Sequence, residues 1–192
     1  MSKLLDVKIA VIGLGYVGLP LAVTFSKQYL VLGFDIDANR VEQLKAGKDI
    51  TLEVPNSELD AAKNSVDMII KNIDLLSERY ELDSEDLSIL GFSQGAILSW
   101  ALGFYKPNKI RRIMPISGLL HESVITKNKP TFLAYASHGI EDNVIPIEKA
   151  REFIVPISNN NSGIHYKEFN DGHNISQENF SELLKWIEKT NL

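Results

Sequence analysis

Apolar and polar positions repeat along this chain with two different periods, and these periods predict where strands and helices lie. Six runs of five to eight residues, rich in β-branched and aromatic residues, predict strands that are buried on both faces. They cover residues 8–12, 31–37, 87–92, 110–117, 130–137 and 163–169. Because helical segments separate these strands, we predict an α/β fold with three α/β/α layers and a doubly wound sheet of six parallel strands.

The segments between the strands carry apolar residues three or four positions apart, as helices do. The first helix is expected after a glycine-rich turn, with Leu19, Ala22, Val23 and Phe25 packed on the sheet. Further helices are predicted over residues 39–46, from Asn56 or Ser57 to residue 80, and over residues 94–105 and 146–154. A last amphipathic helix carries Phe180, Leu183, Leu184 and Ile187 on one face.

Composition narrows the functions open to these 192 residues. The absence of cysteine excludes disulfide scaffolds, Cys-ligated zinc or iron–sulfur sites and a thiol nucleophile, and we predict no metal site. A formal net charge of −5 argues against a nucleic-acid partner, because such binding needs clustered Lys and Arg. No apolar run approaches the roughly 18 residues of a membrane helix. We therefore expect one soluble, cytoplasmic domain over residues 1–192, with no membrane partner.

A glycine-rich turn follows the first predicted strand. Gly13, Gly15 and Gly18 form G-x-G-x-x-G between a strand and a helix, and Asp35 ends the next strand, 22 residues after Gly13. In dinucleotide-binding folds such glycines let a pyrophosphate approach a helix N-terminus, and the acidic residue binds a ribose hydroxyl. These four residues are therefore a candidate cofactor site. The alternative is that the glycines serve only the turn and its packing.

Residues 8–62 resemble the first third of the NAD-binding domain of bacterial nucleotide-sugar 6-dehydrogenases, through the strings KIAVIGLGYVGLPLA and VLGFDID. The resemblance implies NAD as the cofactor to test. Those enzymes also use a catalytic cysteine and a second βαβ half, neither of which follows Asn64 here. The resemblance therefore does not carry dehydrogenase activity with it.

A second motif lies at the third predicted strand. Gly91, Ser93 and Gly95 form G-x-S-x-G between a strand and a helix, where a sharp turn exposes a nucleophilic serine. Asp142 and His173 follow, each just beyond a later strand. Serine, acid and histidine in this order at strand ends are typical of the catalytic triad of α/β hydrolases.

Residues from about 65 to 192 resemble the phospholipase/carboxylesterase family of α/β hydrolases, through GFSQGA, HGIEDNVIP and DGHNIS. Members of this family are small cytoplasmic serine esterases that act on short acyl esters and require no cofactor. The resemblance implies that Ser93 is the nucleophile, His173 the general base and Asp142 the carboxylate that orients the imidazole. Glu141 remains a weaker alternative for the acid, and His138 matches a structural position of the family motif.

The two resemblances meet near residues 64–66. We therefore interpret the chain as a chimera, most readily an engineered one, of a Rossmann-type βαβ fragment (residues 1–64) and an α/β-hydrolase-type fragment (residues 65–192). A natural fusion would have the same sequence features. We predict the strand order 2-1-3-4-5-6, which brings the turn at Gly13 beside the turn at Ser93 at one crevice. A dinucleotide bound there is expected to compete with an ester.

The exchange of fragments removes a His-Gly loop that supplies one oxyanion donor in the esterase family. We expect the Gln94 N–H to remain as one donor and the Leu14 or Gly15 N–H to stand in for the other. Losing one donor typically costs about 10²–10³ in rate. The leading hypothesis is thus a triad with weak or no carboxylesterase activity on a small-molecule ester. The alternatives are a non-catalytic Rossmann-like scaffold that at most binds a dinucleotide, and a fold without any ligand.

Overall fold

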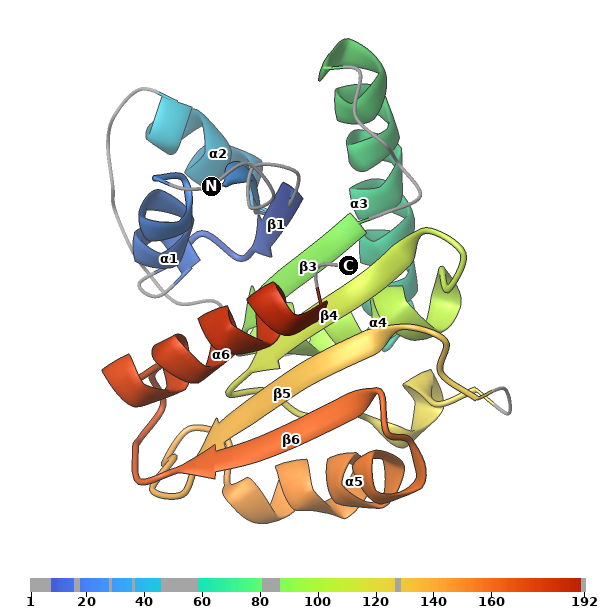
Figure 1. Cartoon of the computed structure of the whole chain (residues 1–192). Helices are drawn as coiled ribbons and strands as arrows, with labels where there is room; N and C mark the ends of the chain where they lie inside the picture. Colours follow the sequence, from blue (N-terminus) through green and yellow to red (C-terminus); the bar gives the residue numbers. More distant parts are fainter. Residues whose placement is uncertain are drawn as a thin grey trace.

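The computed structural model in Figure 1 describes residues 8–15, 18–27, 29–35, 37–45, 59–80, 87–126 and 129–190. Within these ranges six strands form one parallel sheet in the order β2-β1-β3-β4-β5-β6. The strands are β1 (Lys8–Ile12), β2 (Leu30–Phe34), β3 (Leu87–Phe92), β4 (Ile110–Ile116), β5 (Leu133–Gly139) and β6 (Ile164–Phe169). The predicted α/β fold, the six parallel strands and their order are confirmed.

Helices follow the strands along the chain and cover both faces of the sheet (Figure 1). They are α1 (Gly18–Phe25), α2 (Ala38–Lys45), α3 (Leu59–Tyr80), α4 (Gln94–Tyr105), α5 (Ile147–Asn160) and α6 (Gln177–Thr190). A short 3₁₀ helix, η2 (Glu122–Val124), follows β4. None of the helices described for the chain is both long enough and apolar enough to cross a lipid bilayer.

Alternation along β1 shows how the two faces of the sheet are filled. Ile9 and Val11 pack into a cluster with residues of α1 and α6. Ala10 and Ile12 point to the other face and pack with residues of α3, α4 and α5. Successive side chains of a strand alternate between faces, so a strand covered by helices on both sides must be apolar throughout. Each cluster contains residues of both fragments.

The predicted joint near residues 64–66 lies inside α3, a single helix of 22 residues. Val66, Ile69 and Ile73 of this helix are buried against the sheet. Ion pairs from Lys106 to Asp67 and from Lys109 to Asp74 add polar contacts along the helix. The two fragments are thus joined by regular structure. The predicted helix start at Asn56 or Ser57 lies outside the described residues.

Several element boundaries and one packing prediction differ from the structure. Strand β2 ends at Phe34 instead of residue 37, so Asp35 follows this strand instead of ending it. Strand β5 begins at Leu133 instead of residue 130, since Pro130 has no N–H for the ladder, and it ends at Gly139 instead of residue 137. Helix α5 continues past residue 154 through Pro156, which is exposed, so its ring meets solvent on the outer face. Val23 is 56% exposed, and the prediction that it packs on the sheet is wrong.

Candidate active site

The sharp turn between β3 and α4 places Ser93 at the carboxyl edge of the sheet. Ser93 has φ 56° and ψ −114°, a left-handed conformation that is rare for a residue with a side chain. Its N–H donates to the carbonyl oxygen of Ile116 at 2.9 Å. A Cβ on Gly91 would lie 2.0 Å from the Gly95 oxygen, and one on Gly95 would lie 2.2 Å from the Ile12 oxygen. Both glycines of the motif are therefore required by close backbone approach.

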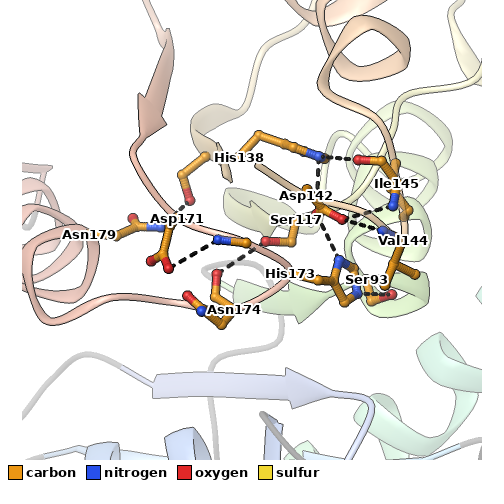
Figure 2. Close-up of polar contacts among 12 residues, drawn as sticks. Ser93, Ser117, His138, Asp142, Val144, Ile145, Asp171, His173, Asn174 and Asn179 are labelled. Carbon is orange, nitrogen blue, oxygen red and sulfur yellow. Dashed lines mark hydrogen bonds and ion pairs between the residues drawn. The ribbon is translucent and has the colours of Figure 1, made fainter. Parts of the chain in front are cut away.

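Ser93, His173 and Asp142 form one continuous hydrogen-bonded line (Figure 2). Nε2 of His173 lies 3.0 Å from Oγ of Ser93, and Nδ1 of the same ring lies 2.7 Å from Oδ2 of Asp142. The three residues lie 49 and 31 positions apart along the chain and come from the ends of β3, β5 and β6. The predicted nucleophile, base and acid are thus within hydrogen-bonding distance. The line runs from serine through imidazole to carboxylate.

Asp142 is held as an anion in a buried position. Burial raises the pKa of its carboxyl group, but hydrogen bonds from His173 and from the N–H groups of Ile145 and Val144 more than offset this and hold the pKa below its usual value. Oδ1 accepts those two N–H groups at 2.8 and 2.9 Å, so the loop itself orients the carboxylate. Glu141 is exposed, and the structure gives the contact with the imidazole to Asp142.

Three neighbours fix the loop that carries His173. Oγ of Ser117, a residue with φ 50° at the end of β4, donates to the Asn174 oxygen at 3.3 Å. The ring of Phe92 lies 4.9 Å from the imidazole, measured between centroids. Gly139 lies so close to this loop that a Cβ would be 2.2 Å from the Gly172 oxygen. Phe92 and Gly139 lie within the motifs GFSQGA and HGIEDNVIP, whereas no motif contains Ser117.

The glycine-rich turn keeps the backbone of its motif. Gly13 has φ +86°, a conformation that favours glycine. A Cβ on Gly18 would lie 1.7 Å from the Gly13 oxygen, so the helix approaches the strand as the motif predicts. Gly15 is exposed, and apart from its chain neighbours no residue that the structure describes lies within 4 Å of the position of a Cβ there. The described residues therefore leave the second glycine accessible.

Asp35 and Leu14 are bound to each other. The Leu14 N–H donates to Oδ2 of Asp35 at 2.8 Å, while Oδ1 accepts the Asp37 N–H at 3.0 Å. Asp35 follows β2, which lies on the side of β1 opposite to β3 and Ser93. The Leu14 N–H is thus directed away from the serine. The expectation that it stands ready as an oxyanion donor is not met, because the Asp35 carboxylate already accepts that hydrogen.

Gln94 begins helix α4, immediately after the serine. The first N–H groups of a helix have no intrahelical acceptor, so the Gln94 N–H is a natural donor towards the space in front of Ser93.

The other histidines lie elsewhere in the fold. His138 is buried, His121 is half-buried and His165 is exposed on β6. Nε2 of His138 lies 3.3 Å from Oδ2 of Asp142.

Comparison with known proteins places most of the chain in one family. Residues 49–191 match the family described as Phospholipase/Carboxylesterase. The chain belongs to the phospholipase/carboxylesterase family. Solved structures agree in fold with this assignment. Esterase PE8 superposes with a TM-score of 0.69 at 17% identity, over 96% of this chain and 93% of PE8. The Bacillus cereus carboxylesterase superposes with a TM-score of 0.70 at 16% identity, over 96% of this chain and 88% of the carboxylesterase.

The N-terminal part of this family member has other relatives. Residues 7–74 match the NAD binding domain of the UDP-glucose/GDP-mannose dehydrogenase family. The UDP-N-acetyl-D-glucosamine 6-dehydrogenase of Pseudomonas aeruginosa is 58% identical over 57 residues, which are 30% of this chain and 14% of the dehydrogenase. Protein CapL of Staphylococcus aureus is 44% identical over 82 residues, 43% of this chain and 17% of CapL. The chain thus spans only a small part of the curated relatives that it matches.

The two matches confirm the chimeric architecture, a hydrolase fold that contains a dehydrogenase NAD-binding fragment. The matched ranges share residues 49–74. The predicted joint near residues 64–66 lies within this shared range, in helix α3.

Proposed function

We propose that the chain is a serine carboxylesterase of low activity, which cleaves short acyl esters through Ser93, His173 and Asp142. The observation that carries the proposal is the pair of contacts made by His173, 3.0 Å to Oγ of Ser93 and 2.7 Å to Oδ2 of Asp142. Base, nucleophile and orienting group within such distances are the signature of an activated serine. Membership of the phospholipase/carboxylesterase family supports the ester as the substrate class.

The proposed reaction has two balanced halves. Oγ of Ser93 bonds to the ester carbonyl carbon as Nε2 of His173 takes the hydroxyl proton, and that proton then passes to the departing alcohol. Water next attacks the acyl-serine, His173 again carries the proton, and the acid leaves with Ser93 restored. Asp142 keeps the Nδ1–H tautomer and stabilises the imidazolium that forms in each half. No cofactor takes part.

The number of N–H groups that can stabilise the oxyanion limits the expected rate of ester hydrolysis. The Gln94 N–H is the proposed donor from the hydrolase fragment, while the Leu14 N–H is bound to Asp35. The Gly15 N–H remains the candidate donor from the glycine-rich turn. Because one missing donor costs about 10²–10³ in rate, turnover well below that of a complete esterase site is expected.

Dinucleotide binding is a second candidate function, favoured by the preserved turn at Gly13 and by the exposed, open position at Gly15. Gly13, Gly15, Gly18 and Asp35 would hold the ligand. Asp35 would then have to serve a ribose hydroxyl with a carboxylate that also accepts two backbone N–H groups. Hydride transfer is not part of this proposal.

The test is hydrolysis of p-nitrophenyl acetate by the purified chain beside Ser93→Ala, each with and without saturating NAD. Turnover that is lost in Ser93→Ala supports the esterase, and its inhibition by NAD supports a shared crevice. Equal background rates in both proteins contradict the esterase. In that case an NAD-dependent rise in melting temperature that is absent in Asp35→Ala would support the dinucleotide site.

A further inference from the structure

His138 lies directly behind the proposed triad acid, on the side away from the serine. It is the last but one residue of β5, and its side chain has no exposed surface. Figure 2 shows Asp142 between the two imidazole rings, with His138 on one side and His173 on the other. The carboxylate is therefore in contact with two histidines.

The surroundings of His138 determine which ring nitrogen carries hydrogen. Nε2 lies 2.8 Å from the Ile145 oxygen and 3.3 Å from Oδ2 of Asp142, and a carbonyl and an ionised carboxylate can only accept. Nε2 must therefore carry a hydrogen. Nδ1 is buried and has no hydrogen-bond partner. A hydrogen on Nδ1 would be a buried N–H without an acceptor among the described residues, so the structure favours the tautomer that carries its hydrogen on Nε2.

His138 supports the carboxylate mainly through the Ile145 backbone. Its Nε2–H donates to the Ile145 oxygen at 2.8 Å, and the Ile145 N–H in turn donates to Oδ1 of Asp142 at 2.8 Å. Nε2 also lies 3.3 Å from Oδ2, the oxygen that contacts His173. The imidazole of His138 thus links the Ile145 backbone to the carboxylate of Asp142.

We propose that His138 is a positioning residue of the esterase reaction, whose Nε2–H holds the Ile145 backbone and lies against Oδ2 of Asp142, so that Oδ2 points at His173. This inference rests on the proposed function. His138 itself touches neither the serine nor the ester. Its effect is exerted through the orientation of Asp142.

The other charged groups near His138 are accounted for. Glu168 is its register partner on β6, and Arg151 of α5 forms a two-pronged ion pair with Glu168 at 2.8 and 2.6 Å. The Arg151 hydrogen bond holds the pKa of Glu168 below its usual value despite partial burial. The titratable and charged groups facing His138 are therefore Asp142, His173, Glu168 and Arg151.

The variants His138→Gln and His138→Leu separate positioning from packing. Nε2 of Gln reaches about as far as Nε2 of His and still donates, whereas Leu fills similar space without a donor. With p-nitrophenyl acetate we expect His138→Leu to lower kcat about 10–100-fold with KM within threefold, since a small misplacement of catalytic groups has such effects. His138→Gln should stay within fivefold of the unmodified chain. His165→Leu, on the exposed face of β6, is the matched control and should leave kcat unchanged.

The pH dependence of kcat/KM gives a second measurement, which would not change if His138 served only in packing. Removing the polar N–H that lies 3.3 Å from Oδ2 makes the Asp142 carboxylate easier to protonate, so the acidic limb of kcat/KM should move to higher pH in His138→Leu but not in His138→Gln. Equal kcat and equal profiles for the Leu and Gln variants would overturn the proposal.

Proton NMR tests the same inference without turnover. The far-downfield resonance of the His173 Nδ1–H, identified by its loss in Asp142→Asn, should weaken or shift in His138→Leu and persist in His138→Gln. Nitrogen NMR of the unmodified chain should find the His138 proton on Nε2, which holds even if the Leu variant does not fold. A proton on Nδ1 with a bare Nε2 would overturn the positioning role. An inactive chain that shows the expected resonances would contradict the esterase alone.

Discussion

Phe25 is the residue whose replacement tests most directly whether the two fragments fold as one unit. It lies in α1 of the Rossmann-type fragment and is 2% exposed. Its ring meets that of Phe180 in α6 of the hydrolase fragment edge-on, with centroids 5.3 Å apart, and that of Tyr29 at 6.0 Å. If the fragments share one core, Phe25→Ala must destabilise the whole chain.

The expected loss is large for a single substitution. Replacing a buried Phe by Ala costs about 3–5 kcal/mol, as lost transfer free energy and a residual cavity. For a chain of this length each kcal/mol moves the thermal midpoint by about 2–4 °C, so Phe25→Ala should lower it by about 6–20 °C. The cycle of Phe25→Leu, Phe180→Leu and the double variant should give a coupling of about 0.5–1.5 kcal/mol for the ring pair.

Calorimetry and urea unfolding followed by circular dichroism measure these quantities. Val23→Ala is the matched control, because Val23 lies in the same helix but is 56% exposed, and it should change stability by less than about 0.5 kcal/mol. A midpoint for Phe25→Ala within 2 °C of the unmodified chain would refute the shared core. Two separate unfolding transitions would refute it as well, since a common core predicts one.

Three further outcomes are expected. Asp142→Asn should destabilise the chain at pH 7 and progressively less below about pH 4, because an acid with a lowered pKa stabilises the fold only while ionised; urea titrations across this range measure it. Gly139→Ala should reduce ester turnover about 100-fold in stopped assays, because its Cβ would lie 2.2 Å from the Gly172 oxygen and displace the histidine loop. Asp35→Ala should lower the free energy of unfolding by about 1–3 kcal/mol without NAD, because the Leu14 N–H loses its acceptor; an unchanged urea midpoint would contradict this.

The fold could be predicted from local patterns, because the apolar runs indicate buried strands and the apolar positions three or four residues apart indicate helices between them. Short apolar β-branched runs that alternate with helical segments favour buried parallel strands. The prediction failed where tertiary contacts decide. Val23 fits the helical spacing, but the sheet face it would need is filled by Leu21 and Phe25, which are buried. Strand β5 reaches Gly139 because pairing with β6 continues to Phe169, which no local signal reveals.

The part of the site that could be predicted is the triad, because its three residues follow a fixed order along the chain and each lies at the end of a strand. The motifs single out Ser93, Asp142 and His173 because a strained turn and two strand-end loops each need a particular residue. The contacts that support the site were not predicted, although the resemblance gives His138 a structural position. Ser117 stabilises the histidine loop through one hydroxyl, and His138 contacts Asp142 through one ring nitrogen. Such contacts depend on where a neighbouring strand ends, and a single sequence does not encode that position locally.

At the end of β1 the two fragments pack well together, but the dehydrogenase-type turn that follows does not supply the oxyanion donor that an esterase needs. The absent Cβ of Gly95 allows α4 to approach the last carbonyl of β1, where a Cβ would lie 2.2 Å from the Ile12 oxygen. This contact needs only backbone from β1, so a dinucleotide-type strand serves as well as an esterase strand. The next peptide is different. Its N–H, on Leu14, is bound to Asp35 at 2.8 Å, an acid that dinucleotide-binding folds place there for a ribose. Packing therefore tolerates the exchange of strands, whereas oxyanion stabilisation depends on the direction of one N–H group, and this explains why an assembled triad and a low rate are expected together.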